Sequence, residues 1–456
     1  MEHNILKLLR LFAGYSVRER LRSVSDKLLN IWMWHHFAGN PNVGMSYRPY
    51  YLAKWLNTGN CDVKIFAATP HHLMKVKPSF TEPITREKID SIDYFWIKSS
   101  EYGKTGLKRL INHFKYAWKL YKTNFITQYN LEKPDVIVVS SPHPFHYLAG
   151  LKWAKKYNCK LVFEVRDIWP LSLTELLGTS KFHPLVLYLN WLEKYAYTHS
   201  HAVVSLLPNA FLHMKTKGLK EEKFNYIPNG IDVTDVEKSI RDSDNYVVHS
   251  LMAMKTQGKV LIGYFGAHGI PNKLYNLIDA AEMAQAKGHT NLKFILVGSG
   301  VEKQNLLKYM EKKKCKNVHF FDPVAKAEVP EIVSLVNACY MGIEKRKLYD
   351  YGISPNKLFD YMLAAKPVII TQNGHKNPIY ESGGGICIKP EDPAGLLSAI
   401  LSICNLSEKE AKAMGDKGYN YLLVHHTYEV LANRYDALFR QIIDNDKNKS
   451  SISSLN

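Results

Sequence analysis

Short hydrophobic runs alternate with amphipathic stretches along most of the chain. From residue 28 to about residue 230 the apolar runs have the length of a β-strand, and include LLNIWMW, DVKIFAAT, DVIVVSS, KLVFEV and HAVVSLL. The stretches between them, such as residues 104–122 and YLAGLKWAKKY, carry apolar residues at the spacing of one helix face. The alternation resumes after residue 258 with KVLIGYFGA, KFILVGSG, NVHFFDPV, ACYMGI, KPVIIT and GGICIKP. Strands alternating with helices form parallel sheets covered on both faces. The pattern predicts an α/β protein with two Rossmann-like parallel-sheet domains facing a cleft.

The two series of strands are separated by a polar stretch with little hydrophobic pattern. We predict a first domain over residues 28–240, a linker with one short helix over residues 241–257 and a second domain over residues 258–425. The last helical stretch, residues 426–444, follows the final strand and is expected to pack back across the domain boundary. Ligands of such folds bind outside the carboxyl ends of the strands, which is where the chemistry is expected.

The stretch SPNKLFDYM predicts a helix that begins with polar groups directed at a ligand. Ser354 suits the N-cap and Pro355 the first helical position. Asn356, Lys357 and Asp360 are three or four residues apart and share one flank. Free N–H groups and a lysine at a helix start attract an anion, and a carboxylate one turn later can accept hydrogen bonds from a ribose diol. This predicts a nucleotide-sugar site; the alternative is a solvated Lys357 and an Asp360 that stabilises the helix start.

A glycine-containing turn follows the first strand of the second domain. GYFGAHG places Gly266, His268 and Gly269 where backbone N–H groups can approach a phosphate, although a structural turn is an equal alternative. The turn is not G-x-G-x-x-G and lacks the acidic residue that contacts a nicotinamide ribose. A nicotinamide-dependent oxidoreductase is therefore disfavoured.

Several polar residues and one glycine lie in the loops and helix starts that follow the predicted strands of the first domain. We predict that they face the cleft, although a histidine is commonly structural and the aspartate can instead cap a helix. These residues are Gly44, Arg48, His143, His146, Arg166 and Asp167.

The composition and net charge limit the classes of partner that the protein can bind. The 456 residues are 46% hydrophobic and 12% aromatic, which indicates a globular protein, and no apolar run has transmembrane length. No signal peptide is expected, because charges interrupt the N-terminal segment. The net charge of +18 indicates anionic partners, namely phosphates, nucleic acid or an anionic membrane face. Six scattered cysteines without a C-x-x-C pair indicate a reducing compartment and argue against a structural zinc site.

Two basic stretches of the sequence are candidates for binding an anionic membrane. Residues 1–27 place apolar residues at helical spacing among several Lys and Arg, as in an amphipathic surface helix or, alternatively, a tail or a helix packed on its domain. In residues 104–122 lysines surround an apolar face, which either docks on the membrane or packs in the core. The residues of this face are Leu107, Leu110, Ile111, Phe114 and Trp118.

Taken in order, these motifs resemble the retaining glycosyltransferases of family 4. The similarity is carried by FEVRDIWP, YIPNGID, GYFGAHG, LVGSG and SPNKLFDYMLAAKPVI, and extends from about residue 28 to the C-terminus. It implies the GT-B fold, with the donor nucleotide bound mainly by the second domain. MSYRPYYLA, EVRDIWP and SPNKLFDYM resemble the branch that builds bacterial surface polysaccharides such as O-antigen and capsule. In that branch N-acetylfucosamine and other amino-sugars are transferred to undecaprenyl-diphosphate-linked acceptors.

The resemblance implies roles for the donor-site residues. The loop from Gly266 to Gly269 resembles the family's diphosphate loop, with Lys273 the nearest basic residue after it. The backbone near Val324 resembles the segment that reads the base, and Asp360 matches the acid that contacts the ribose.

The family's other acid is missing from this sequence. Its position is Gly352, and the upstream acids Asp350 and Glu344 do not have the family spacing. Lys357 and Asn356 would therefore make more of the contacts that hold the donor.

The function implied is transfer of a sugar, with retention, from a UDP-linked amino-sugar to a polyprenyl-diphosphate-linked saccharide. Lys357 would stabilise the leaving diphosphate in place of a metal ion, so no cofactor is expected, and His143 or His146 matches a histidine that contacts the donor sugar. The protein is expected in the cytoplasm, peripheral on the inner face of the bacterial plasma membrane. The alternatives are a UDP-N-acetylhexosamine 2-epimerase of the same architecture and a nucleic-acid-binding protein, for which no recognition motif is present.

Overall fold

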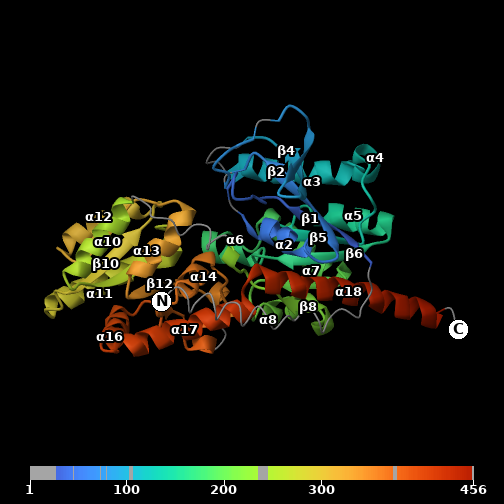
Figure 1. The fold of residues 1–456 in the computed structure, drawn as a ribbon. Coiled ribbons are helices and arrows are strands. Elements are labelled where there is room, and N and C mark those ends of the chain that lie inside the picture. The colour runs from blue at the N-terminus through green and yellow to red at the C-terminus, as the bar shows by residue number, and fades with distance from the viewer. Residues whose placement is uncertain are drawn as a thin grey trace.

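The computed structural model describes residues 27–453, apart from residues 45, 72, 79, 102–105, 235–244 and 373–376. The chain forms two α/β domains that lie side by side (Figure 1). Residues 1–26, which make up nearly all of the predicted basic amphipathic segment, lie outside the described residues. None of the described helices combines the length and the apolar character needed to cross a bilayer.

The first domain is built on an eight-stranded sheet in the order β3-β4-β2-β1-β5-β6-β7-β8. Neighbouring strands are parallel except β3 and β4, which pair antiparallel. The strands are β1 (Leu29–His35), β2 (Cys61–Thr69), β3 (Ile84–Ile89), β4 (Ile92–Lys98), β5 (Val136–Ser141), β6 (Lys160–Val165), β7 (Ala202–Ser205) and β8 (Phe224–Tyr226).

Helices cover both faces of this sheet. They are α2 (Arg48–Leu56), α3 (Gly106–Lys122), α4 (Phe125–Tyr129), α5 (Tyr147–Tyr157), α6 (Leu171–Leu177), α7 (Pro184–His199) and α8 (Phe211–Met214), with short 3-10 helices η2 (Lys215–Lys217) and η3 (Glu221–Lys223). Alternate residues of β1 enter different cores: Trp32 and Trp34 pack on one face, Ile31 and Met33 on the other. Two cores on one sheet explain why the strand runs are apolar throughout.

The second domain contains a fully parallel six-stranded sheet in the order β11-β10-β9-β12-β13-β14. Its strands are β9 (Val260–Phe265), β10 (Leu292–Val297), β11 (Val318–Phe321), β12 (Ala338–Met341), β13 (Val368–Thr371) and β14 (Gly385–Ile388). Its helices are α10 (Tyr246–Thr256), α11 (Leu274–Ala286), α12 (Lys303–Lys312), α13 (Val329–Leu335), α14 (Asn356–Leu363), α15 (Pro378–Ser382), α16 (Pro393–Cys404) and α17 (Glu408–His425), with η4 (Ile270–Asn272), η5 (Lys326–Glu328) and η6 (Lys347–Tyr351).

The last helix, α18 (Tyr428–Ser453), returns to the first domain. Figure 1 shows it running from the end of α17 along the first domain, near α2. Leu431, Tyr435 and Phe439 of α18 share a hydrophobic core with Leu52 and Ala53 of α2. The chain therefore crosses between the domains twice.

The predicted fold class is confirmed, with two local differences. The β3–β4 hairpin was not predicted; its turn residues Asp90 and Ser91 have φ values of 45° and 72°, as a tight hairpin turn requires. The exposed strand β3 carries Arg86, Glu87 and Lys88, so its sequence lacks the apolar run of the other strands. Residues 246–256 of the predicted linker form α10, which packs in the core of the second domain.

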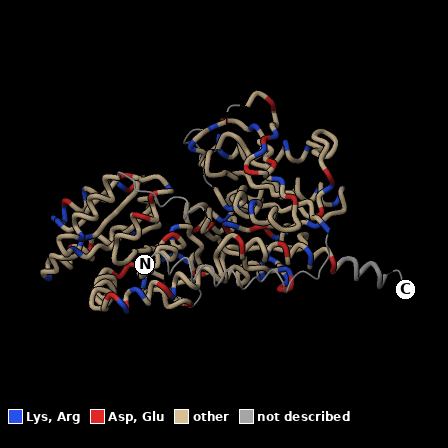
Figure 2. Tube along the Cα trace, in the orientation of Figure 1, with Lys and Arg blue, Asp and Glu red and all other residues tan. Residues whose placement is uncertain are grey.

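Positive charge is distributed over both domains. Figure 2 shows Lys and Arg interspersed with Asp and Glu along the described chain. Such a distribution differs from the single basic face of a typical nucleic-acid-binding domain.

Candidate functional site

A cavity of about 290 Å³ lies between the two domains. Residues that follow strands of the first domain form one wall, and loops of the second domain together with the start of α14 form the other. The lining residues that matter for the chemistry are Arg166, Asp167, Asn229, Asn272, Gly352, Ser354 and Lys357. The cavity therefore lies where ligands bind in parallel α/β sheets.

Lys357 is a half-buried cation that lines this cavity. Its Nζ donates hydrogen bonds to the Tyr264 hydroxyl (2.8 Å) and to Asn272 Oδ1 (2.5 Å). Its ammonium also lies 4.6 Å from the centre of the Tyr264 ring. No carboxylate pairs with it among the described residues, and burial lowers the pKa of Lys357 to about 7. An anionic ligand placed beside Nζ would therefore favour the charged form.

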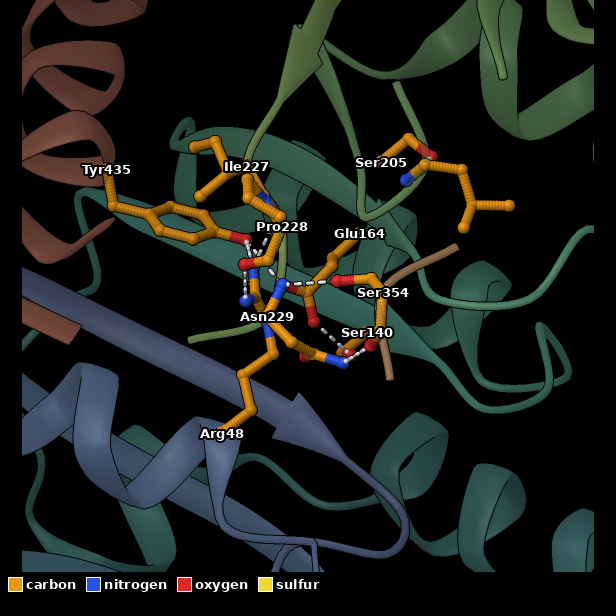
Figure 3. A network of polar contacts seen from close by, with 10 residues as sticks. Arg48, Ser140, Glu164, Ser205, Ile227, Pro228, Asn229, Ser354 and Tyr435 are labelled. Atoms are coloured by element: carbon orange, nitrogen blue, oxygen red, sulfur yellow. Dashed lines mark hydrogen bonds and ion pairs between the residues drawn. The ribbon is translucent and has the colours of Figure 1, made fainter. Parts of the chain in front are cut away.

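The start of α14 is attached to the first domain, which corrects the predicted cap. Pro355 occupies the N-cap position, and no side chain caps the helix. Ser354 Oγ instead accepts a hydrogen bond from Asn229 N (2.8 Å), and Asn229 Nδ2 donates to the Ser354 carbonyl (2.7 Å). Figure 3 shows these contacts between Asn229, in the motif YIPNGID, and Ser354, which precedes α14. The first N–H groups of the helix remain without a side-chain cap beside the cavity, while Asn356 is exposed.

The two glycine turns of the second domain pack against each other. Gly266 and Gly298 have φ values of 145° and 148°, and a Cβ on Gly298 would lie 2.0 Å from the Gly266 carbonyl oxygen. The His268 N–H donates to the Ser299 carbonyl (2.8 Å). A Cβ on Gly266 would lie 3.6 Å from Lys357 Cδ. The predicted diphosphate loop is thus adjacent to Lys357, as expected if both hold one anion.

His268 lies in the same turn. Its imidazole is buried, and neither ring nitrogen has a hydrogen-bond partner among the described residues. Burial, with the charges of Lys303 and Lys357, lowers the pKa of His268 to about 4. The ring is therefore neutral at physiological pH. Gly269 follows and forms the N-cap of η4.

Other predicted donor residues already have partners within the protein. Lys273 Nζ lies 3.3 Å from Glu344 Oε1 and 3.1 Å from Glu391 Oε1. Glu344 also accepts from Arg346 Nε (2.6 Å), so neither Lys273 nor Glu344 has an uncompensated charge to offer. Asp360 is paired with Lys326 of η5. Val324 is half-buried and packs on the core of its domain between β11 and η5.

Gly352 occupies the position of the missing family acid. Its φ is 107° and its ψ is −178°, a conformation essentially restricted to glycine. A Cβ at this position would lie 2.4 Å from Pro208 Cδ of the first domain. The Asn209 N–H donates to the Tyr351 carbonyl (2.9 Å), so η6 is attached to the first domain immediately before Gly352. No side chain fits here while the domains are in this contact.

Gly352→Ala is expected to weaken the contact between η6 and Pro208 and to lower the free energy of unfolding by about 1–3 kcal/mol. Gly383→Ala is the matched control, because Gly383 also has a positive φ of 67° but a Cβ there would meet no atom nearer than 3.7 Å. Denaturant unfolding of both variants measures the difference. An equal loss in the two would attribute the effect to backbone strain alone and contradict the steric explanation.

Arg166 and Asp167 follow β6 and line the cavity from the first domain. Arg166 Nη1 is buried and has no hydrogen-bond partner among the described residues. The Asp167 side chain is open to the cavity, yet the surrounding protein raises the pKa of its carboxyl, and Arg166 partly opposes this. The pair therefore offers a guanidinium and a carboxylate across the cavity from Lys357.

The structure corrects the acceptor-side role predicted for Arg48. Its side chain is buried, and its Nε donates to Glu164 Oε2 (2.9 Å). Its remaining nitrogens donate to the Ile227 carbonyl (2.9 Å) and to the Pro228 carbonyl (Figure 3). All three guanidinium nitrogens of Arg48 therefore have hydrogen-bond partners within the first domain. Gly44, with a φ of 122°, would place a Cβ 2.8 Å from the Leu73 carbonyl oxygen and shapes a loop away from the cavity.

His143 and His146 do not line the cavity either. Both are buried in the first domain at the carboxyl end of β5. His146 precedes α5, and its Nε2 lies 3.3 Å from the Trp34 carbonyl. Their predicted contact with the donor sugar is not supported by this placement, because neither ring reaches the interdomain surface.

Three residues of the site were not predicted from the sequence. Asn272 orients Lys357, and Asn229 joins the start of α14 to the first domain. Tyr264 supplies both a hydroxyl and a ring to Lys357. The only signal for them was that Asn229 and Tyr264 lie inside the motifs YIPNGID and GYFGAHG.

Two Rossmann-like domains that face a cleft are the architecture of the GT-B fold. Residues 44–235 match the family model Glycosyltransferase Family 4, and residues 259–405 match the family model Glycosyl transferases group 1. The chain thus carries glycosyltransferase domains on both sides of its cleft. No curated protein matches it in a sequence search.

Solved structures share this fold. Sucrose-phosphate synthase from Thermosynechococcus elongatus is 15% identical, with a TM-score of 0.66 over 91% of this chain and 100% of that chain. The Anabaena protein HepE in complex with UDP and glucose is 14% identical, with a TM-score of 0.59 over 90% and 99%. The trehalose-6-phosphate protein from E. coli bound with UDP-2-fluoro glucose is 11% identical, with a TM-score of 0.67 over 90% and 99%. At such identities the similarity concerns the fold.

Proposed function

We propose that this glycosyltransferase transfers a sugar, with retention, from a UDP-linked amino-sugar to a polyprenyl-diphosphate-linked saccharide. The bond between the anomeric carbon and the β-phosphate oxygen breaks. The acceptor oxygen bonds to the same face of the sugar, and its proton passes to a phosphate oxygen of the departing UDP. The reaction would contribute to bacterial surface polysaccharide at the cytoplasmic face of the plasma membrane.

The observation that carries the proposal is Lys357, a half-buried cation without a carboxylate partner among the described residues, beside a glycine turn and an uncapped helix start. Such groups stabilise the charge that develops on a leaving diphosphate. They can do so without an oxygen-coordinated Mg²⁺ or Mn²⁺, so we propose that the donor site needs neither ion. Solved structures of the same fold hold UDP with glucose and UDP-2-fluoro glucose, which is consistent with a UDP-sugar donor.

Arg166 and Asp167 are proposed to contact the acceptor side of the cavity. The unpartnered Arg166 Nη1 suits an anionic or hydroxyl oxygen of the incoming saccharide. Asp167 can orient the attacking hydroxyl. Both face the donor groups across the domain boundary.

Support for a membrane surface comes from α3. Its buried residues are Asn112, His113, Tyr116 and Leu120. The predicted apolar face is largely exposed instead of packed in the core: Leu107 is 70% exposed, Trp118 60%, and both Ile111 and Phe114 43%. Lys108, Lys115 and Lys122 are exposed on the same helix. Exposed apolar residues among lysines are typical of a surface that inserts shallowly into an anionic leaflet.

The apolar surface continues from α3 to α7. Phe114 contacts Phe145 (ring centroids 4.7 Å apart), and Phe145 contacts Tyr188 of α7 (6.2 Å). Tyr188 in turn contacts Trp191 (5.8 Å), which is 50% exposed. A surface that spans two helices of the first domain can hold that domain against a bilayer that carries the acceptor.

The experiment combines pure protein, UDP-N-acetylhexosamines and an undecaprenyl-diphosphate-sugar acceptor in anionic vesicles, with and without added Mg²⁺. UDP release that depends on the acceptor, together with a mass gain of one sugar on the lipid, is expected and should not need Mg²⁺. Isomerised sugar nucleotide without acceptor would instead identify an epimerase. Full activity on a soluble acceptor without vesicle binding would remove the membrane part of the proposal.

The affinity for a UDP-sugar is expected to decrease as the pH rises through about 7. Lys357 has a pKa of about 7 in the free protein, and the diphosphate of the ligand favours its protonated form. Binding is therefore tightest below pH 7 and weakens by up to about tenfold per pH unit above it. Calorimetric titration with UDP-N-acetylglucosamine in buffers of different ionisation enthalpy measures the proton uptake. A Lys357→Met variant should show neither the uptake nor the slope, and a wild-type affinity independent of pH between 6 and 9 would contradict the assignment.

A further inference from the structure

Three histidines from three elements meet inside the first domain, away from the cavity. His36 directly follows β1, His113 lies on α3, and His143 follows β5. All three are buried, and one ring nitrogen from each lies within 4.8 Å of the others. The rings of His113 and His143 stack with centroids 3.9 Å apart, and the His36 ring lies 4.7 Å from that of His143. His36 and His143 lie at the carboxyl ends of the neighbouring parallel strands β1 and β5, which is a usual place for ligands.

His143 lacks the hydrogen bonds that a buried imidazole normally makes. Its side chain is fully buried, and neither Nδ1 nor Nε2 has a partner among the described residues. A neutral imidazole carries one N–H and one lone pair, and buried polar groups are nearly always paired. Both nitrogens of His143 thus remain available to a ligand.

His36 is held in a defined tautomer by Asn112. The Asn112 side-chain amide donates to Ser99 Oγ (2.7 Å) and to the Ser100 carbonyl (2.6 Å), which fixes its Oδ1 as the acceptor facing His36. His36 Nε2 lies 2.8 Å from this oxygen and must donate to it. The lone pair is therefore on His36 Nδ1, which has no hydrogen-bond partner among the described residues. An amide oxygen behind a histidine is the outer-shell contact that orients metal ligands.

We propose that His36, His113 and His143 bind a Zn²⁺-type transition-metal ion in the first domain, separate from the donor site. Nitrogen ligands select Zn²⁺, Co²⁺ or Ni²⁺ over Mg²⁺, which prefers oxygen. In a tetrahedral zinc site with Zn–N bonds of about 2.0–2.1 Å, ligand nitrogens lie about 3.3 Å apart, so the separations in the cluster must shorten by at most about 1.5 Å. Three protein ligands leave a fourth position for water.

One further observation fits a metal here. The inward face of α3 presents Asn112 and His113 together with Tyr116 and Leu120, while Leu107, Ile111, Phe114 and Trp118 are exposed. A bond from the metal to His113 would attach this helix to the segments that follow β1 and β5.

The test uses full-length protein without a histidine tag. After removal of metal with a chelator, it is titrated with Co²⁺ and with Zn²⁺, and the visible absorption of tetrahedral Co²⁺ and the metal content are measured. We expect about one ion per chain in the wild type and none in His143→Gln. The exposed His199→Gln is the matched control and should bind as the wild type does. Asn112→Leu should weaken Zn²⁺ binding by about 10- to 100-fold.

Absence of the tetrahedral Co²⁺ spectrum from the wild type would overturn the proposal, even if His143→Gln fails to fold. Equal metal binding by wild type and His143→Gln would overturn it as well. Because the readout is metal content and not sugar transfer, a failure here is distinguishable from a failure of the proposed glycosyltransferase reaction.

Discussion

Replacement of Lys357 by methionine is expected to lower kcat/KM for sugar transfer by about 100- to 1,000-fold. Methionine keeps much of the side-chain volume next to Tyr264 but removes the charge beside Gly266. The lost interaction is stronger in the transition state than with the bound donor, because negative charge increases on the diphosphate as the sugar departs. The loss should therefore appear in kcat as well as in KM.

The measurement is the initial rate of acceptor-dependent UDP release over a range of donor concentrations. Lys412→Met is the matched control: Lys412 is exposed on α17 and paired only with Asp416, so its loss should leave both kcat and KM unchanged. A Lys357→Met enzyme with a raised KM but a normal kcat would show that the lysine binds the donor without stabilising the leaving group.

The two-domain fold was predictable because its signals are local. Each buried strand is a run of apolar residues, and each helix between strands keeps a helical spacing, so YLAGLKWAKKY was read correctly as Tyr147–Tyr157. The signal failed where burial is one-sided or absent, as in β3 with its exposed Arg86, Glu87 and Lys88. The short helix predicted in the linker is present as α10, but its three buried residues Val247, Val248 and Leu251 are too few to indicate from sequence that it packs in the core of the second domain.

The candidate site was only partly predictable, because its contacts join distant parts of the chain. Lys357 stood out as a charge at a predicted helix start and Arg166 as a charge after a predicted strand, and both line the cavity. The bond between Asn229 and Ser354 spans 125 residues and leaves no periodic signal. Ser354 was assigned to the helix cap because serine commonly occupies that position, yet the tertiary contact with Asn229 took precedence.

His143, His146 and Arg48 were predicted to face the cleft, but the structure places them away from the cavity. Their positions after strands and at a helix start are those of ligand-binding residues, but burial decides the outcome. Arg48 pairs with Glu164 in the interior of the first domain, and the His143 ring packs against two other histidine rings. A sequence identifies which residues lie at the carboxyl end of a sheet, whereas the direction of each side chain depends on packing.

Arg48→Met is expected to lower the free energy of unfolding by about 3–5 kcal/mol, because it leaves Glu164 buried without its partner. The guanidinium connects α2, β6 and the segment after β8, and lies beside Tyr435 of α18 (Figure 3). Burial opposes ionisation of Glu164, yet Arg48 and Arg166, with hydrogen bonds from Ser140 and Tyr435, hold its pKa at about 2. Arg86→Met removes an exposed ion pair with Asp93 and is the control, with an expected loss below about 1 kcal/mol.

The pH dependence of the loss identifies its cause. Without Arg48, burial should raise the pKa of Glu164 above its unfolded value, so the unpaired charge destabilises the variant increasingly as the pH rises above about 4.5. The difference from wild type should therefore be smaller at pH 5 than at pH 8 in denaturant unfolding. Adding Glu164→Gln to Arg48→Met should recover part of the stability, because the neutral amide needs no counter-charge. A loss that is independent of pH and not reduced by Glu164→Gln would mean that Arg48 acts through its contacts with the Ile227 and Pro228 carbonyls instead.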